Sequence, residues 1–290
     1  MSTTSIPPRL RFFALLLFAM ISTAPSGADE TMNLAGTWRF QLDRADAGRS
    51  GQWQRHELTG TFKLPGSLPE RGVGDPVSVA TKWTGSIFDK SWFTAPAYAP
   101  YRQPGNIKVP FWLQPETHYV GAAWFQRDIE IPADWHDRHV TLRLERPHWK
   151  TSVWLDDTAL GSNDSLSVSH EYDLGAAVAT GRHRLTVRVD NTLDPDIGEN
   201  SHSVSDHTQG NWNGIVGRIE LVATAPAWIE DLQVYPRLRD RVAVVRGRVA
   251  LAGNRAMPAS VRVVGAVRGA AVEPEVNAPV AADGSFAVEY

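Results

Sequence analysis

Two pairs of polar and aromatic side chains, Asp206–His207 and Asn211–Trp212, lie in a long connection at 191–213. Their carboxylate, imidazole and amide groups can form paired hydrogen bonds with sugar hydroxyls, and the flat apolar face of tryptophan matches the C–H face of a sugar ring. The connection therefore predicts carbohydrate contacts by these four residues. The alternative is a structural loop that is fixed by packing of Trp212 against the body of the protein.

The same connection also carries side chains of the kinds that bind metals. Asp194 and Asp196 supply the carboxylate oxygens that Ca²⁺ prefers, and His202 with His207 supplies imidazole ligands suited to Zn²⁺. Neither pair follows an established ligand spacing. We therefore expect no cofactor and no metal site, with a structural Ca²⁺ as the alternative.

Other chemistries lack the residues they need. The sequence has no cysteine, which excludes disulfides, thiolate nucleophiles and cysteine-ligated metals. It has no Gly-x-Ser-x-Gly turn and no glycine-rich phosphate loop. The adjacent carboxylates Asp156 and Asp157 fall at a predicted hairpin turn rather than forming a catalytic pair. A formal net charge of −3 gives no electrostatic reason to expect nucleic acid or a membrane surface as a partner.

The N-terminus has the pattern of a secretory signal peptide. Arg9 and Arg11 precede an apolar run at 12–20, and the small residues at 26–28 suit cleavage after Ala28. The run is too short to span a bilayer comfortably, although a tethered N-terminal helix is the alternative. We expect residues 1–28 to be removed and the mature chain to be periplasmic or extracellular.

The segments that must position these side chains alternate apolar and polar residues with period two. At 182–190, for example, Leu185, Val187 and Val189 share one face. Further strands are expected at 122–131, 141–145, 150–155, 215–222, 232–235, 241–251, 260–267 and 286–290. Many short strands separated by turns, with no amphipathic helical stretch, predict an all-β protein built of sandwiches.

A stretch rich in proline, glycine and tryptophan at 64–119 interrupts this pattern. Structureless loops of this length usually carry function. The stretch holds several of the 11 tryptophans of the chain, and it is the best candidate for ligand contact outside the strands. A lid that packs against another domain is the interpretation we prefer for Trp83, Trp92, Trp112, Tyr98 and Tyr101.

The composition shifts to valine, alanine and arginine near 223–226, which predicts a domain boundary there. The first domain then covers 29–225. The second, at 226–290, is shorter than the roughly 100 residues of an immunoglobulin-like sandwich. We therefore expect it to be an incomplete sandwich.

Four segments resemble, in the same order, motifs of the sugar-binding domain of glycoside hydrolase family 2, the β-galactosidase and β-glucuronidase family. They are G-A-A-W-F-Q-R with I-E-I-P at 121–132, V-W-L-D-D at 153–157, L-T-V-R-V-D-N at 185–191 and N-W-N-G-I-V-G-R-I-E-L at 211–221. Position 157 holds aspartate where the family has glycine. With G-T-W-R-F at 36–40 and L-P-G-S at 64–67, the resemblance covers about residues 33–224.

The resemblance implies a jelly-roll, galactose-binding-like β-sandwich, then a truncated immunoglobulin-like β-sandwich, with the catalytic TIM barrel and its two glutamates absent. It also implies that Asp190 and Asn191, at a strand end, contact a sugar hydroxyl. We accordingly expect no catalytic residue here, a β-linked glycan as ligand and the barrel of the same polypeptide as partner. A stand-alone carbohydrate-binding protein and an inert truncated product are the alternatives.

Overall fold

The computed structural model describes residues 29–290 except 176–177, 194–196, 253–254 and 268–269. The predicted signal peptide at 1–28 lies outside the described residues, so its removal and the export of the chain stay predictions. No helix in the described part of the chain is long and apolar enough to cross a membrane.

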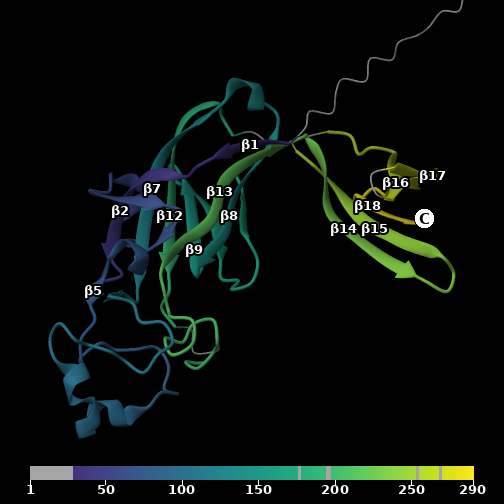
Figure 1. Cartoon of the computed structure of the whole chain (residues 1–290). Coiled ribbons are helices and arrows are strands. Elements are labelled where there is room, and N and C mark those ends of the chain that lie inside the picture. Colours follow the sequence, from purple (N-terminus) through teal and green to yellow (C-terminus); the bar gives the residue numbers. More distant parts are fainter. Residues whose placement is uncertain (1–28, 176–177, 194–196, 253–254, 268–269) are drawn as a thin grey trace, which may run out of the picture.

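The first domain is a sandwich of two antiparallel sheets (Figure 1). One sheet has the order β10-β9-β12-β7-β2-β3, and the other has the order β1-β13-β8-β11 with β4 paired to β13. The strands are β1 (Glu30–Asn33), β2 (Gly36–Asp43), β3 (Gly60–Leu64), β4 (Gly66–Ser67), β7 (Ala122–Ile131), β8 (His139–His148), β9 (Lys150–Leu155), β10 (Thr158–Asn163), β11 (His170–Asp173), β12 (Gly181–Asp190) and β13 (Gly214–Thr224). The all-β prediction is confirmed.

The core of this sandwich follows from the alternation along its strands. Leu185, Val187 and Val189 of β12 are fully buried between the sheets, as predicted. The opposite face of the same sheet is covered by residues 44–58, which include the 3₁₀ turn η1 (Trp53–Arg55). Trp124 lies on this outer face, 0% exposed, and its Nε1 donates to Asp43 Oδ2 over 3.0 Å.

Gly66 and Gly214 lie close together where β4 pairs with the start of β13. The short strand β4 carries Gly66 and pairs with the start of β13 at Gly214. Gly214 has φ +137°, and a Cβ there would lie 2.5 Å from the Gly66 carbonyl oxygen. Only glycine lets the two backbones approach this closely.

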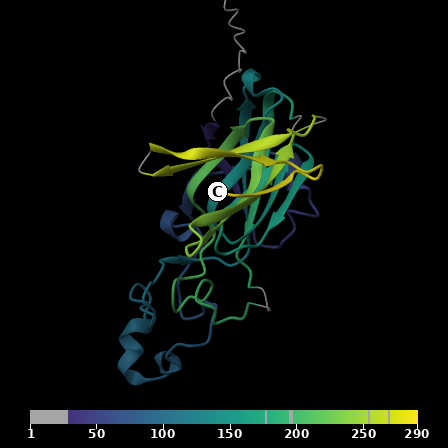
Figure 2. The ribbon, with the colours of Figure 1, turned by 90° about the vertical axis from the view of Figure 1, so that its right-hand side faces the viewer.

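Most of the stretch at 65–121 projects beyond one end of the sandwich (Figures 1 and 2), while β4 at its start pairs with β13. It contains the ladder of β5 (Asp75–Pro76) with β6 (Thr117–His118) and the 3₁₀ segments η2 (Pro69–Arg71), η3 (Lys90–Phe93) and η4 (Pro96–Arg102). Trp92 is its buried centre, 2% exposed, whereas Trp112 is 92% exposed. The predicted structureless loop is therefore a small folded unit, with Trp92 inside, Trp112 outside and Trp83 partly buried against Phe111 and His118.

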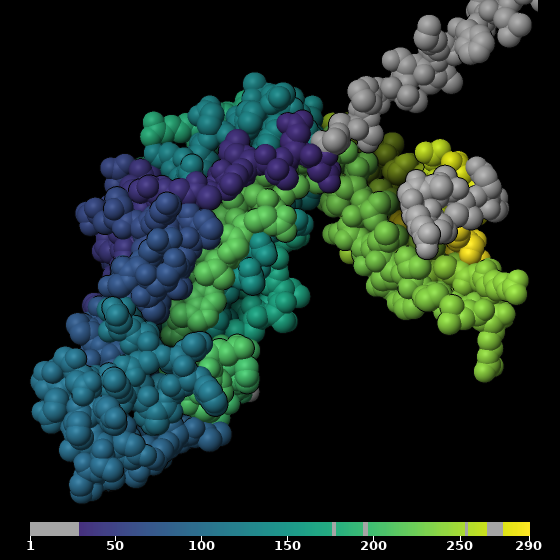
Figure 3. All heavy atoms as spheres, viewed as in Figure 1, coloured from purple at the N-terminus to yellow at the C-terminus, as the bar shows by residue number. Residues whose placement is uncertain are grey.

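The second domain begins with β14 (Ala227–Arg237) and forms a separate lobe (Figure 3). β14, β15 (Val242–Leu251) and β18 (Ser285–Glu289) make one antiparallel sheet, and β16 (Ser260–Val267) pairs with β17 (Ala270–Pro279). The strand β17 was missing from the prediction. The core of the second domain centres on Val245, Val249, Ala278 and Phe286. In β14, by contrast, Leu232 and Val234 are 59% and 57% exposed.

The junction between the domains includes one aromatic stack. His139, the first residue of β8, lies face to face with Trp228 of β14, with ring centroids 3.7 Å apart. Its Nε2 is 3.1 Å from Asp173 Oδ1. His139 is thus a buried contact between the domains, while its neighbour His136 is exposed and ends the turn η5 (Ala133–Trp135).

Candidate functional site

The loop 191–213 and the stretch 65–121 meet at a buried carboxylate. Asp206 is 2% exposed, and its Oδ2 accepts a hydrogen bond from the Thr84 backbone N–H over 2.6 Å. His118 Nε2 lies 3.1 Å from the same oxygen, and Oδ1 accepts from the Asn211 N–H over 2.8 Å. Several donors thus hold the charge of Asp206, which removes much of the cost of burying it.

Three asparagines continue this network toward the sandwich. Asn191, 0% exposed, donates from Nδ2 to the carbonyl oxygens of Tyr119 and Asn211, and its Oδ1 accepts from the Gly121 N–H over 2.8 Å. Asn211 donates back to the Asn191 carbonyl oxygen over 3.1 Å, and Asn213 donates to the Gly121 carbonyl oxygen over 2.8 Å. These amides fix the ends of β7, β12 and β13 to one another. We call this set, with Asp206, Thr84 and His118, the loop junction.

Trp212 lies against His148 beside the loop junction. The two rings stack with centroids 4.6 Å apart. His148 Nδ1 is 2.6 Å from the Trp212 carbonyl oxygen and Nε2 is 2.9 Å from the Ser203 carbonyl oxygen. A neutral imidazole donates to only one of these oxygens. Burial lowers the pKa of His148, although both carbonyls favour its protonated form.

A pocket of about 600 Å³ opens at the loop junction. Asp206, Asn211 and Trp212 line it together with His118, Glu70 and residues from the stretch that precedes β6. Asn211 Oδ1 is buried and has no hydrogen-bond partner among the described residues. The pocket is therefore lined by an aromatic ring together with carboxylate and amide side chains, a combination suited to a polyhydroxylated ligand.

The remaining predicted residues lie near this pocket without lining it. Asp190 points to the outer face of its sheet, where its Oδ1 accepts from the Thr192 N–H over 2.8 Å and its Oδ2 from Arg188 over 3.1 Å. Burial raises the pKa of Asp190, but these donors outweigh burial and lower the pKa below its usual value. The side-chain amide of Asn191 is fully engaged in the hydrogen bonds of the loop junction. His207 packs against Gly85, where an added Cβ would lie 2.9 Å from its Nδ1.

The structure brings no metal cluster into view in the part of the chain that it describes. No three His, Asp or Glu side chains gather there in an arrangement that could hold an ion. Asp194 and Asp196, the alternative Ca²⁺ ligands, lie outside the described residues. Asp156 and Asp157 form the turn between β9 and β10, as expected.

Sequence reasoning missed three contributors to the site: His118 and Glu70, which line the pocket, and Thr84, which donates to Asp206. His118 and Thr84 precede Asp206 by 88 and 122 positions, so no local spacing connects them. Glu70, on η2, comes from the segment that follows L-P-G-S. The L-P-G-S motif was the signal that could have pointed to Glu70, because the pairing of this motif with β13 brings η2 to the pocket.

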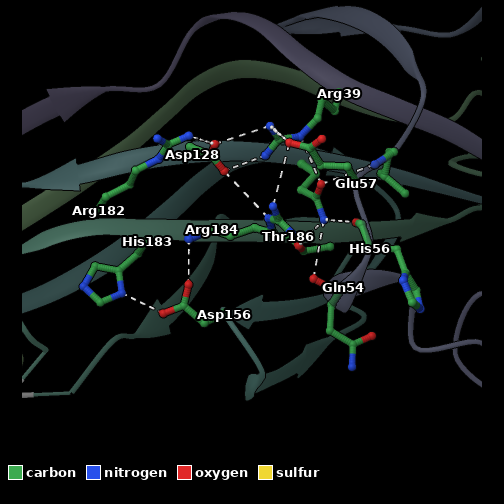
Figure 4. A network of polar contacts seen from close by, with 12 residues as sticks. Arg39, Gln54, His56, Glu57, Asp128, Asp156, Arg182, His183, Arg184 and Thr186 are labelled. Carbon is green, nitrogen blue, oxygen red and sulfur yellow. Dashed lines mark hydrogen bonds and ion pairs between the residues drawn. The ribbon is translucent and has the colours of Figure 1, made fainter.

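A second charged network lies on the outer face of the six-stranded sheet, at the opposite end of β12 (Figure 4). Asp128 receives Arg39 Nη2 at 2.6 Å and also pairs with Arg182. Hydrogen bonding by Arg39 lowers the pKa of Asp128 to about 2. Nearby, His183 Nδ1 lies 2.7 Å from Asp156 Oδ2. These charged side chains pair with one another, so we interpret the network as a structural feature of the sheet.

A two-sheet sandwich with a polar and aromatic pocket at its loop end is compatible with a module that binds carbohydrate. Comparison with known families gives the same class: residues 31–225 match the model of the glycosyl hydrolases family 2 sugar binding domain. The chain belongs to this family.

Individual relatives are distant, and the chain spans only part of each. A β-glucuronidase of Pongo abelii is 21% identical over 85% of this chain and 37% of its own length. A β-galactosidase of Arthrobacter sp. (strain B7) is 24% identical over 58% of this chain and 16% of its own length. Among solved structures, a β-glucuronidase of an uncultured Clostridium sp. has a TM-score of 0.57 at 18% identity and covers 90% of this chain and 39% of its own. The last similarity supports the fold.

Proposed function

We propose that this chain is the non-catalytic N-terminal part of an exported family 2 glycoside hydrolase. The whole protein would act like a β-galactosidase on O-glycosidic bonds of β-linked glycans. The observation that carries the proposal is the pocket in which Trp212, Asp206 and Asn211 meet, within a domain that belongs to the sugar-binding family. Its role is to contact the sugar and to position loops against a catalytic barrel.

The second domain supports the part of the proposal that concerns a longer polypeptide. Leu232 and Val234 share one face of β14 and are 59% and 57% exposed, which leaves an apolar surface open on this strand. Further strands and the barrel would cover this surface. Trp112, 92% exposed on the projecting stretch, would face the same barrel as a lid.

The direct test uses the intact reading frame. Its product is assayed on nitrophenyl β-galactoside, β-glucuronide and β-mannoside, and cleavage of at least one is expected. Cleavage of none by a folded product would contradict the enzymatic part of the proposal. The coding sequence beyond Tyr290 offers a second check, because a barrel with two catalytic glutamates is expected there.

A stand-alone carbohydrate-binding protein is the competing function, and the accessible ring of Trp112 favours it, since such rings stack on sugars. Calorimetry of the 290-residue chain against a panel of glycans separates the two. Submicromolar binding by this chain alone would favour the stand-alone function. Binding only in the millimolar range fits a contact surface that depends on a barrel. Export is tested by N-terminal sequencing of the secreted protein, with Asp29 as the expected first residue.

A further inference from the structure

The pocket at the loop junction has a one-sided charge. Two of its lining residues, Asp206 and Glu70, carry carboxylates, and none of the described residues that line it is lysine or arginine. Arg71 Nη2 lies 3.4 Å from Glu70 Oε1, but Arg71 does not line the pocket. The charged side chains that line the pocket are therefore both anionic, while its neutral side chains Ser67, Gln114 and Gln209 can donate as well as accept hydrogen bonds.

We infer that this pocket takes a neutral glycosyl unit and discriminates against a uronate. The inference rests on the proposed sugar-binding function and names the class of sugar. Hydroxyls of a neutral sugar can donate to the carboxylate of Glu70 and can pair with the side chains of Ser67 and Gln209, while Trp212 offers an apolar wall. A uronate carboxylate in the same place would meet two like charges, and no guanidinium or ammonium group lines the described part of the pocket to offset them, an arrangement that penalises burial.

A neighbouring pocket of about 450 Å³ is lined by cations, unlike the pocket at the loop junction. It lies on the other side of His118, which lines both pockets, and its cations are Arg44 and Lys82. Both terminal nitrogens of Arg44 are already bound to Asp75, at 2.9 Å each. Lys82 is exposed. A carboxylate seeking a cation would therefore find Lys82 in the neighbouring pocket rather than a group beside Trp212.

The inference conflicts with what the names of the relatives suggest. Several of the relatives are β-glucuronidases, whose names denote a uronate substrate. Identities of 18–22% to these proteins leave room for a different sugar. The charge of this chain's own pocket decides the preference.

The test compares two ligands that differ only at C6, methyl β-glucoside and methyl β-glucuronide. Their binding to the 290-residue chain is measured by calorimetry at neutral pH. We expect the glucoside to bind at least about tenfold more tightly, since tenfold corresponds to only about 1.4 kcal/mol. Glu70→Lys, which places a cation on the pocket wall, should shift the ratio toward the glucuronide by about tenfold. Glu57→Lys makes the same change on an exposed side chain at the far network and should leave the ratio unchanged.

The outcomes separate the inference from the proposed function. Equal or tighter binding of the glucuronide by the unaltered chain would overturn the neutral-sugar inference and leave sugar binding intact. Binding of neither ligand at tens of millimolar would overturn both. An unchanged ratio in Glu70→Lys, with a melting curve like that of the unaltered chain, would place the sugar elsewhere and overturn the inference. Loss of glucuronide binding in Lys82→Gln alone would assign that ligand to the neighbouring pocket and support the inference.

Discussion

The strand core and the loop junction of the first domain are both almost completely buried, yet opposite kinds of side chain build them. In the core, Val187 and its neighbours exclude water and make few directional contacts. At the loop junction, Asp206 and Asn191 are buried because backbone groups satisfy them, both within the same loop at Asn211 and far away in the sequence at Thr84 and Gly121. Apolar packing tolerates small shifts, whereas a buried polar network fails when one partner is lost. The fold should therefore survive changes that destroy the pocket.

The largest effect is expected in the core. Trp38→Ala removes a side chain that is 1% exposed and whose Nε1 donates to the Leu34 carbonyl oxygen over 2.9 Å. We expect a loss of about 3–5 kcal/mol in the free energy of unfolding, measured by urea denaturation. Trp112→Ala, at 92% exposure, is the matched control and should change stability by less than about 0.5 kcal/mol. Similar losses in both variants would contradict the assigned positions of the two rings.

The next effect concerns the loop junction. Asn191→Ala leaves the Gly121 N–H and the Tyr119 carbonyl oxygen without their amide partner. We expect about 2–3 kcal/mol of destabilisation and the loss of sugar binding, because each buried unpaired group costs roughly 1–3 kcal/mol. Denaturation and calorimetry on the same preparation check both. Retained sugar binding in a destabilised variant would show that the pocket does not depend on this network.

His148, which stacks on Trp212, should make the stability of the folded protein depend on pH. The pKa of His148 is lowered in the folded protein from the usual 6.5, so the unfolded chain binds the proton more readily. Stability should therefore fall as the pH drops below about 6.5, until the folded pKa is reached. Melting curves at pH 7.5 and pH 5.5 measure this loss, and His148→Gln should reduce it. Greater stability at pH 5.5 would mean instead that both carbonyls bind a protonated ring.

The smallest effect belongs to the charged network at the far end of the sheet. Arg39 holds the pKa of Asp128 at about 2, below the usual 3.8, so the stabilisation is fully present above pH 3.8 and is lost as the pH falls through 2. Asp128→Asn should cost about 1 kcal/mol or less at pH 7, since the pair lies near solvent. The cost should vanish near pH 2. A cost that is the same at both pH values would exclude the ion pair as its cause.

Local patterns predicted the strand core well and the loop junction only in part. The strands at 122–131, 150–155 and 260–267 follow from period-two alternation, and their predicted bounds match those of β7, β9 and β16. The strand β17 was missed because its sequence, with Pro274 and few bulky residues, carries a weak strand signal.

The candidate site likewise contains some residues that the sequence could group and others that it could not. Asp206, Asn211 and Trp212 share one short segment, so the sequence could group them. Whether Asp190 or Asn191 faces the pocket depended on the side of the sheet that each takes at the end of β12. The partners His118 and Thr84 come from the projecting stretch, whose path is set by the Gly66–Gly214 approach and by long-range pairing. No residue spacing encodes such a path.

Amide hydrogen exchange in Asp206→Ala tests most directly whether the carboxylate joins the two loops. In the unaltered chain, the Thr84 and Asn211 N–H groups donate to Asp206. The account predicts that both exchange at least about tenfold faster in the variant, while the amides of β7 and β12 keep their protection. Asp157→Asn, at an exposed turn, should leave all of these rates unchanged. Unchanged protection of Thr84 and Asn211 in Asp206→Ala would contradict the account.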